Sequence, residues 1–232
     1  MADAKELNEL NRKFYQKVAP FFSQTRQGWW VGWEKLPLPQ NGDWVLDVAA
    51  GNCRFANFLA SKKWQGEYVA VDNCQELLDL SVTDKKQQAV IDLLSALQNQ
   101  EDWQKKLPRT EFNYVICNAF FHHIPKKIWR EKMLRDLWRL TAKNGFLIVS
   151  LWQFMNDAKM TNKVVEDLGD NDYILPWKNG TEAKRYCHNF TMTEIAELQA
   201  ILAAEKAKLV VNGTADGATG QMNYYLGWQK LS

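Results

Sequence analysis

The chain has 232 residues, of which 46% are hydrophobic, and its formal net charge is +2. This length and composition favour one large α/β domain with a sizeable core, and no apolar run is long enough to span a bilayer. The small net charge does not by itself indicate a nucleic-acid partner.

The first segment of the chain is expected to form an amphipathic helix. Leu7, Leu10, Phe14 and Val18 repeat at helical spacing, and Pro20 is predicted to end the helix. These opening residues are unlike a signal peptide, and the four cysteines are widely spaced without a CxxC pair. We therefore expect reduced thiols, a cytoplasmic location, no metal site and no membrane partner.

The middle of the chain alternates between strand-like and helix-like runs, which predicts a parallel sheet covered on both faces by helices. A polar, turn-rich insertion at 153–189 interrupts this alternation, and a helix at about 191–205 follows it. The last two strand-like runs favour an antiparallel edge. The predicted strands are 44–49, 68–72, 89–93, 112–117, 145–152, 208–213 and 222–231. We treat residues 1–232 as a single domain, with an N-terminal helical cap at 1–40 and a lid at 153–189.

The stretch WVLDVAAGNCRF, residues 44–55, has the pattern of a buried strand that passes into a helix through a tight turn. Such turns bind nucleotide-like ligands in α/β folds. The triple-glycine fingerprint of dinucleotide binding is absent, because Ala49 and Ala50 precede a single Gly51. The turn therefore indicates a ligand that does not require close contact between the backbone of the turn and a pyrophosphate.

Acidic residues follow three successive predicted strands. Asp72 comes 21 residues after Gly51, where an acid can accept hydrogen bonds from ribose hydroxyls, and Asp92 could meet a nucleobase amine. With Asp47 they would repel a polyphosphate, but they suit a ligand with an adenosine and a cationic centre, such as S-adenosylmethionine. Each acid alone could equally be a helix cap or part of a turn, and the series of three favours the cofactor.

The first two-thirds of the chain resembles the class I S-adenosylmethionine-dependent methyltransferases. The resemblance implies a Rossmann-like α/β fold: a mostly parallel seven-stranded sheet with an antiparallel last strand and helices on both faces. It assigns Asp47, Ala49 and Gly51 to the methionine portion, Asp72 to the ribose, Asp92 and Leu93 to the adenine, and Asn118 to the methyl-transfer site. Alanine at position 49 replaces the usual glycine and is expected to narrow the turn.

Two arginines are candidates for the methyl acceptor site. Arg26 lies in an aromatic segment ahead of the sheet, and Arg185 lies in the insertion. An isolated arginine most often forms a surface ion pair, but two in such segments could provide planar donors for a carboxylate or phosphate. His122 and His123 are adjacent, so they lack the i, i+4 spacing of helical metal sites. If this segment is extended they point opposite ways; either could be purely structural, and one could face the pocket.

Four blocks of the sequence resemble, in the same order, those of one tRNA methyltransferase family: FYQKVAPFFSQTR, AFFHHIP, YILPW and RYCHNF. That family methylates the carboxylate of 5-carboxymethyluridine at the tRNA wobble position. The resemblance implies tRNA as partner, and some members also need a small zinc-binding activator protein. The resemblance implies that Arg26, Arg185, Tyr186 and His188 meet the modified uridine or the adjoining backbone. With His122 they are the catalytic candidates. Cys187 stands where the lid block usually has a second tyrosine.

Other functions stay open at this stage. The chain could methylate a small carboxylic acid or another metabolite, or it could be a non-catalytic methyltransferase-like subunit. The helix predicted from Lys126 to Lys143 is rich in basic residues, including Arg130. Those residues either form a solvated outer face or contact phosphates. A carboxylate acceptor is already ionised at neutral pH, so the reaction would need no general base.

Overall fold

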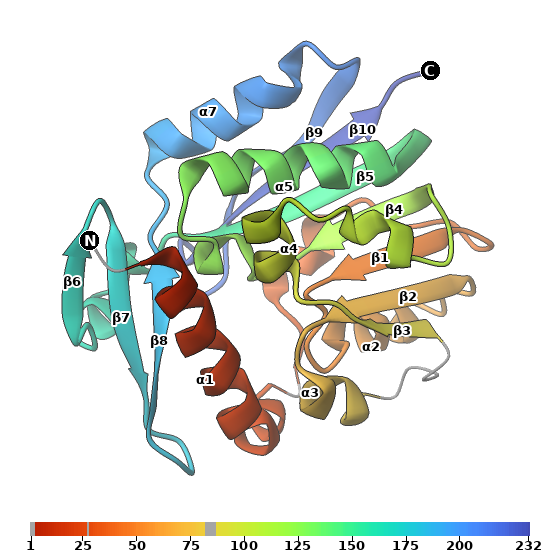
Figure 1. Ribbon diagram of the computed structural model, residues 1–232. Coiled ribbons are helices and arrows are strands. Elements are labelled where there is room, and N and C mark those ends of the chain that lie inside the picture. Colours follow the sequence, from red (N-terminus) through yellow and green to blue (C-terminus); the bar gives the residue numbers. More distant parts are fainter. Residues whose placement is uncertain (1–2, 27, 82–86) are drawn as a thin grey trace.

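The computed structural model describes residues 3–26, 28–81 and 87–232, and a seven-stranded sheet runs through its centre (Figure 1). The strand order is β3-β2-β1-β4-β5-β10-β9. The pairings among β1 to β5 are parallel, and β10 is antiparallel to both of its neighbours. The strands are β1 (Trp44–Val48), β2 (Glu67–Asp72), β3 (Gln88–Val90), β4 (Phe112–Cys117), β5 (Thr141–Trp152), β9 (Ala207–Ala215) and β10 (Asn223–Lys230). The Rossmann-like α/β fold expected from the sequence is confirmed.

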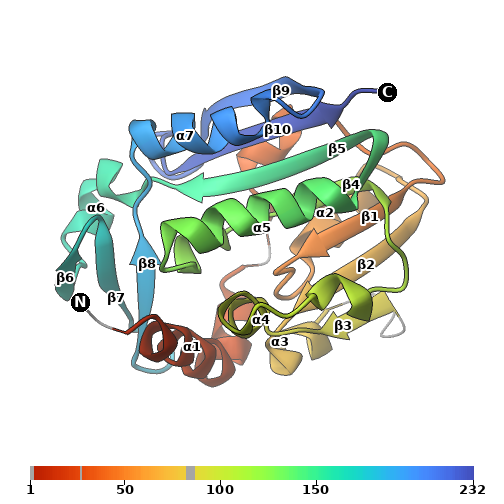
Figure 2. The same ribbon diagram turned by 45° about the horizontal axis from the view of Figure 1, so that its top comes forward.

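Helices cover both faces of this sheet because successive strand side chains point to opposite sides. In β1, Leu46 and Val48 join the core cluster that includes α4, α5 and α7, whereas Val45 joins the cluster that includes α2. The turned view shows α4, α5 and α7 side by side over one face (Figure 2). The helices are α1 (Ala4–Gln24), α2 (Arg54–Ser61), α3 (Gln75–Asp79), α4 (Leu93–Asn99), α5 (Lys127–Leu140), α6 (Ala158–Thr161) and α7 (Met192–Ala203). None of the helices in the described part of the chain is both long and apolar enough to cross a membrane.

The insertion contains regular structure that its polar sequence did not predict. Beside the main sheet stands a three-stranded antiparallel sheet, which consists of β6 (Glu166–Gly169), β7 (Asp172–Trp177) and β8 (Ala183–His188) (Figure 1). The N-terminal helix α1 packs along β8, at the edge of this small sheet. The side-chain amide of Asn11 accepts a hydrogen bond from the backbone N–H of Tyr186 at 2.8 Å and donates to the Tyr186 carbonyl at 3.2 Å. This amide satisfies backbone groups that a bare strand edge would leave unpaired.

Helix α1 also continues through Pro20 to Gln24, so the prediction that Pro20 ends the helix is wrong. A proline inside a helix removes one backbone hydrogen bond and crowds the preceding turn. Tertiary contacts hold the last turn in place. The ring of Phe22 packs 5.7 Å from that of Trp177, and the Ser23 hydroxyl accepts a hydrogen bond from Asn52 at 3.0 Å. Packing therefore overrides the local preference, and it carries the helix to the edge of the cavity described next.

Candidate active site

A cavity lies at the carboxyl ends of β1, β2 and β4. Its wall includes the turn after β1, Asp72 at the end of β2 and Asn118 directly after β4. Residues of α1 and of the 3-10 turn η1 (Val31–Lys35) close it from the other side. Open α/β sheets bind their ligands in this position, where the strand order changes direction.

The turn after β1 has three residues in the left-handed region of backbone space: Ala49 with φ 59°, Gly51 with φ 56° and Cys53 with φ 56°. Glycine adopts this conformation freely, whereas an alanine in it is strained by about 1–2 kcal/mol. The methyl group of Ala49 packs against the main core cluster, and Ala49, Ala50 and Gly51 all line the cavity. The chain thus makes the tight turn despite the missing glycine.

Asp72 connects this turn with the one after β2. Its two carboxylate oxygens accept hydrogen bonds from the backbone N–H of Gly51 at 2.8 Å and of Cys74 at 2.9 Å. Burial raises the pKa of Asp72, and these N–H groups act in the opposite direction. Each carboxylate oxygen has a second lone pair, so Asp72 can still accept a hydrogen bond from a ligand hydroxyl in the cavity.

Asp47, at the end of β1, is buried in the wall of the same cavity and accepts a hydrogen bond from the hydroxyl of Tyr68. Burial raises the pKa of Asp47 to about 7, and the nearby charge of Asp72 adds to the effect. A cationic group bound beside Asp47 would favour its ionised form.

Asp92 is a helix cap in the structure. Its carboxylate accepts hydrogen bonds from the backbone N–H and from the hydroxyl of Ser95, both at 2.9 Å, at the start of α4. Leu93 and Ile91 line the cavity, but Asp92 is not part of its wall. The observed contacts of Asp92 are those of the capping alternative that the sequence left open.

The cavity wall also contains polar atoms that the described part of the chain does not satisfy. Both amide atoms of Asn118 and the indole N–H of Trp33 are buried without a hydrogen-bond partner. Buried polar groups are normally paired, so these atoms indicate a polar ligand. Together with Asp47 and Asp72, they offer the donors and acceptors that the ribose hydroxyls and amino-acid portion of S-adenosylmethionine require, and Leu93 offers an apolar contact for adenine.

Arg26 and Arg185 lie against α1 and interact electrostatically, but neither side chain is part of the cavity wall. The guanidinium of Arg185 lies over the rings of Phe14 at 5.2 Å and Trp152 at 5.1 Å, and that of Arg26 lies 5.2 Å from the ring centre of Phe22. Neither arginine forms an ion pair with any carboxylate of the described residues, and Nε of Arg185 is buried without a hydrogen-bond partner. The structure thus brings together the two arginines that lie far apart in the sequence.

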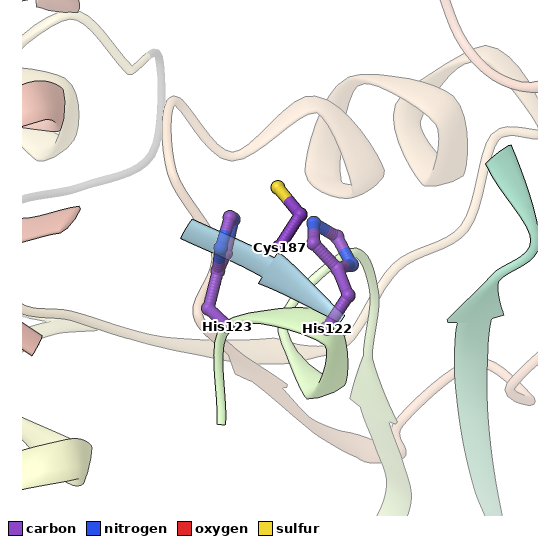
Figure 3. Close-up of side chains that lie close together, drawn as sticks. All are labelled: His122, His123 and Cys187. Atoms are coloured by element: carbon purple, nitrogen blue, oxygen red, sulfur yellow. The ribbon is translucent and has the colours of Figure 1, made fainter. Parts of the chain in front are cut away.

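The two adjacent histidines are in a 3-10 turn, η4 (Phe121–His123), rather than in an extended segment. Their ring centres are 4.1 Å apart, so the expectation that they point opposite ways is wrong. Figure 3 shows both rings beside the side chain of Cys187, which comes from β8. The possible ligand atoms of the three residues lie within 4.8 Å of one another, but the nearby positive charge of Arg185 disfavours a cation there.

His123, rather than His122, lines the cavity. Its Nδ1 lies 2.9 Å from the Tyr186 carbonyl and 3.1 Å from the amide nitrogen of Asn11, and its Nε2 forms a hydrogen bond with the Tyr15 hydroxyl at 2.7 Å. Tyr15 in turn accepts a hydrogen bond from Nη1 of Arg185 at 3.3 Å. Burial lowers the pKa of His123 to about 3 and that of His122 well below its usual range. Both rings are neutral at physiological pH.

The side chains of Tyr186 and His188 form hydrogen bonds with other residues of the protein and do not line the cavity. The Tyr186 hydroxyl donates to Asp172 at 2.7 Å, and the two ring nitrogens of His188 lie 2.6 Å from Asp172 and 2.8 Å from Glu194. These contacts join β8, β7 and α7. Hydrogen bonds from His188 and Thr191 outweigh the effect of burial and lower the pKa of Glu194 to about 2.

The basic helix α5 does not present Arg130 to an RNA. Arg130 is only 6% exposed and donates to the Ile124 carbonyl at 3.0 Å and to Glu194 at 3.4 Å. Lys132 and Arg139 both pair with the buried carboxylate of Asp136. The hypothesis that Arg130 contacts phosphates is therefore wrong, because the guanidinium is used to pack α5 against α7.

Sequence reasoning did not select several residues of the cavity wall, namely Tyr15, Trp30, Trp33 and Arg54. For Arg54 a signal was present. It is the first residue of α2 and directly follows the glycine turn, whereas cations are disfavoured at the positive end of a helix. A cation at such a position indicates a nearby negative group.

Known proteins resemble the part of the chain that carries this site. Residues 45–145 match the family described as methyltransferase domain. A methyltransferase-like protein of Encephalitozoon cuniculi is 27% identical over 194 residues, which cover 80% of this chain and 82% of that protein. A Schizosaccharomyces pombe protein named tRNA (carboxymethyluridine(34)-5-O)-methyltransferase is 22% identical over 174 residues, which cover 73% of this chain and 68% of that protein.

Solved structures share the fold. An S-adenosylmethionine-dependent methyltransferase of Methanosarcina mazei superposes with a TM-score of 0.61 at 17% identity, covering 88% of this chain and 99% of that one. A chain of the Haloferax volcanii complex between the Trm112 methyltransferase activator and a methyltransferase has a TM-score of 0.63 at 12% identity, covering 95% of this chain and 97% of that one. The family match spans β1, the glycine turn and the strands that end at the cavity. Residues 45–145 thus match a methyltransferase domain, and the chain has the fold of S-adenosylmethionine-dependent methyltransferases.

Proposed function

We propose that the chain transfers the methyl group to the carboxylate of 5-carboxymethyluridine at the wobble position of tRNA, and forms the methyl ester. The relative in Schizosaccharomyces pombe carries the name of this activity. The observation that carries the proposal is the pair Arg26 and Arg185, which lie beside the cavity without a carboxylate partner among the described residues.

Two neighbouring guanidinium groups repel each other, and the aromatic rings around them do not neutralise their charge. A bound anion would relieve this repulsion, and guanidinium groups hold a carboxylate through paired N–H donors. The unpartnered Nε of Arg185 provides one such donor. One hydrogen bond joins Arg185 to Tyr15, and another joins Tyr15 to His123. Together they fix the position of Arg185 relative to the cavity.

The chemistry requires orientation more than proton transfer. When bound, S-adenosylmethionine supplies an electrophilic methyl group on a positively charged sulfur. A carboxylate is ionised at neutral pH, so no base is needed, and neutral His123 with both ring nitrogens engaged fits this requirement. Arg26 and Arg185 are proposed to orient the carboxylate oxygen toward the methyl group, and Asn118 to line the transfer site. His122, Tyr186 and His188 would support this arrangement from behind the cavity wall.

The decisive assay uses an anticodon stem–loop RNA that contains 5-carboxymethyluridine, together with isotopically labelled cofactor. The nucleosides are then analysed by mass spectrometry. The expected product is the methyl ester, from which mild alkali releases the label as methanol. A product that keeps the label in alkali, as an N-methyl or C-methyl group does, would contradict the proposal.

A small carboxylic acid as acceptor is the alternative, and a salt titration of binding separates it from RNA. Lys184 is exposed and adjacent to Arg185 in β8, so Lys184→Ala should weaken RNA binding and reduce the salt slope by about 1. Lys105 is a matched control, because it is exposed in the 3-10 turn η3 (Trp103–Lys106), ahead of the amino end of β4. Salt-independent binding, with activity on the free nucleoside equal to that on the RNA, would favour the small acid.

An activator protein is part of the proposal. The Haloferax volcanii neighbour was solved with the Trm112 activator, and the edge strand β3 of this chain carries Val90, which is 52% exposed. We propose that a small zinc-binding activator associates with the chain. Co-expression followed by size-exclusion chromatography should yield a stable 1:1 complex, and separate elution of the two proteins would contradict this part of the proposal.

A further inference from the structure

Arg54 is a third arginine, and its side chain belongs to the wall of the cavity. Its guanidinium lies over the rings of Trp30 at 5.1 Å and Trp33 at 5.8 Å, and Nη1 donates to the Gly28 carbonyl at 3.1 Å. It lines the cavity and forms no ion pair with a carboxylate of the residues that the structure describes. Methyl transfer to an acceptor held by Arg26 and Arg185 does not use this group.

The position of Arg54 favours a bound anion, although the nearby acids Asp47 and Asp216 already offset part of its charge. It is the first residue of α2, where the helix dipole is positive. Burial, together with the charge of Arg26, lowers the pKa of Arg54 to about 10, so the side chain remains charged at neutral pH. An anion bound here would be stabilised both by the guanidinium and by the helix N-terminus.

A second observation indicates a ligand at the same place. The indole of Trp33 is 2% exposed, lines the cavity, and its N–H has no hydrogen-bond partner among the described residues. Its ring lies beneath the Arg54 guanidinium. An unpaired buried N–H next to a charged guanidinium forms a pair of donors for one oxyanion.

The opposite charge is close by. Asp47 is 3% exposed in the same wall, and Asp47 and Arg54 interact electrostatically across the turn that joins β1 to α2. An acid and a guanidinium on either side of one turn match an α-amino-acid group, which carries an ammonium and a carboxylate on a single carbon atom.

We infer that Arg54 and the indole N–H of Trp33 bind the α-carboxylate of the cofactor's amino-acid portion, opposite Asp47, which binds its α-ammonium. Arg26 interacts electrostatically with Arg185 and with Arg54. The three arginines thus serve two anions: Arg54 binds the cofactor carboxylate, and Arg26 with Arg185 binds the acceptor. Arg54 is in this sense a positioning residue for the cofactor.

The test is equilibrium binding by calorimetry, with no methyl acceptor present. The probes are S-adenosylhomocysteine, which has the amino-acid portion, and 5′-methylthioadenosine, which lacks it. Arg54→Gln should weaken S-adenosylhomocysteine binding by about 10- to 100-fold, and leave 5′-methylthioadenosine binding unchanged. Arg54→Lys should restore part of the affinity, because it keeps the charge but loses the planar donors.

Two matched variants complete the experiment. Asp72→Ala should weaken binding of both probes, and Arg185→Gln should weaken neither. Equal losses for both probes in Arg54→Gln would show a merely structural role and overturn the inference. Unchanged S-adenosylhomocysteine binding, together with a raised KM for the RNA, would assign Arg54 to an acceptor phosphate and also overturn it. Since no acceptor is used in the binding assay, its result is independent of the proposed tRNA activity.

Discussion

The cofactor side and the acceptor side of the cavity are constructed differently. On the cofactor side, Asp72 accepts hydrogen bonds from Cys74, two residues away, and from Gly51, 21 residues away. On the acceptor side, Arg185 contacts Tyr15 across 170 positions of the chain. The first side is made of strand ends and the turns that follow them, whereas the second exists only after α1 and the small sheet have docked together.

The two sides also differ in charge. Buried acids, Asp47 and Asp72, predominate on the cofactor side, where backbone N–H groups and a tyrosine hydroxyl partly satisfy them. On the acceptor side, Arg26 and Arg185 lie on aromatic rings instead of beside acids. The acids prepare the first side for a cationic cofactor, and the arginines prepare the second for an anionic acceptor. Substitutions on one side should therefore leave the function of the other intact.

The largest expected effect comes from Arg185→Lys. The variant keeps the charge but loses the planar donors and the stacking on Phe14 and Trp152, so the acceptor is misplaced. Methyl transfer to RNA should fall about 100-fold. Affinity for S-adenosylhomocysteine should stay within about 2-fold, since the lost contacts are not on the cofactor side. Arg12→Lys, at an exposed ion pair with Glu9, is the control. A parallel loss of cofactor affinity would show that the two sides are not independent.

A smaller effect, on cofactor affinity, is expected from Asp72→Ala, and Asp92→Ala serves as the comparison. Asp72→Ala leaves the N–H groups of Gly51 and Cys74 unpaired, which should weaken cofactor binding by about 1–3 kcal/mol. Asp92→Ala removes only a helix cap, so it should lower the free energy of unfolding by about 0.5–2 kcal/mol. Urea denaturation and calorimetry on both variants measure the difference. Equal losses of cofactor affinity in the two variants would instead support the predicted contact of Asp92 with the adenine.

Acid stability tests the contacts that hold β8 on the acceptor side. The pKa of Glu194 is about 2 in the folded chain and 4.5 as its ordinary value. Its contribution to stability is therefore fully present above pH 4.5, and it is lost as the pH falls from 4.5 toward 2. Glu194→Gln should lower Tm at pH 6, and the difference from the unaltered protein should vanish near the acid end of this range.

The control for that experiment is Glu197→Gln, in the same helix. Glu197 pairs with Lys127 on the surface, where both side chains are about half exposed, and such pairs contribute little. A Tm difference for Glu194→Gln that stays constant from pH 6 down to pH 2 would mean that the charge of Glu194 is not what stabilises this region.

The smallest effect is expected at the glycine turn. Ala49→Gly relieves left-handed strain but also makes the unfolded chain more flexible, so the net change in stability should stay below about 1 kcal/mol. Ala50 is the neighbouring control, because its backbone is not in the left-handed conformation. Ala50→Gly gains no relief and should destabilise by about 0.4–1 kcal/mol. Denaturant titrations of both variants give the comparison, and a larger loss for Ala49→Gly than for Ala50→Gly would contradict it.

The sequence was sufficient to predict the main sheet, because each strand is a local apolar run and each crossover helix carries its own periodicity. The same locality revealed Asp47, Gly51 and Asp72 as residues of one edge, since parallel strands end on the same side. It did not reveal that α1 passes through Pro20, or that residues 153–189 contain a sheet. In both cases the energy comes from packing between segments that are distant in the chain.

What the sequence alone determined, then, is the fold class and the chemical character of the cofactor side, where neighbouring residues make the important contacts. Only the tertiary structure decided which of two adjacent histidines lines the cavity, and that Arg130 and His188 are used internally. Tertiary contacts also decided that Arg26 and Arg185 come together beside the cavity without an ion-pair partner among the described residues. The physical reason is that hydrogen bonds and charge neutralisation depend on distance in space, and residue type and spacing do not encode that distance across long stretches of chain.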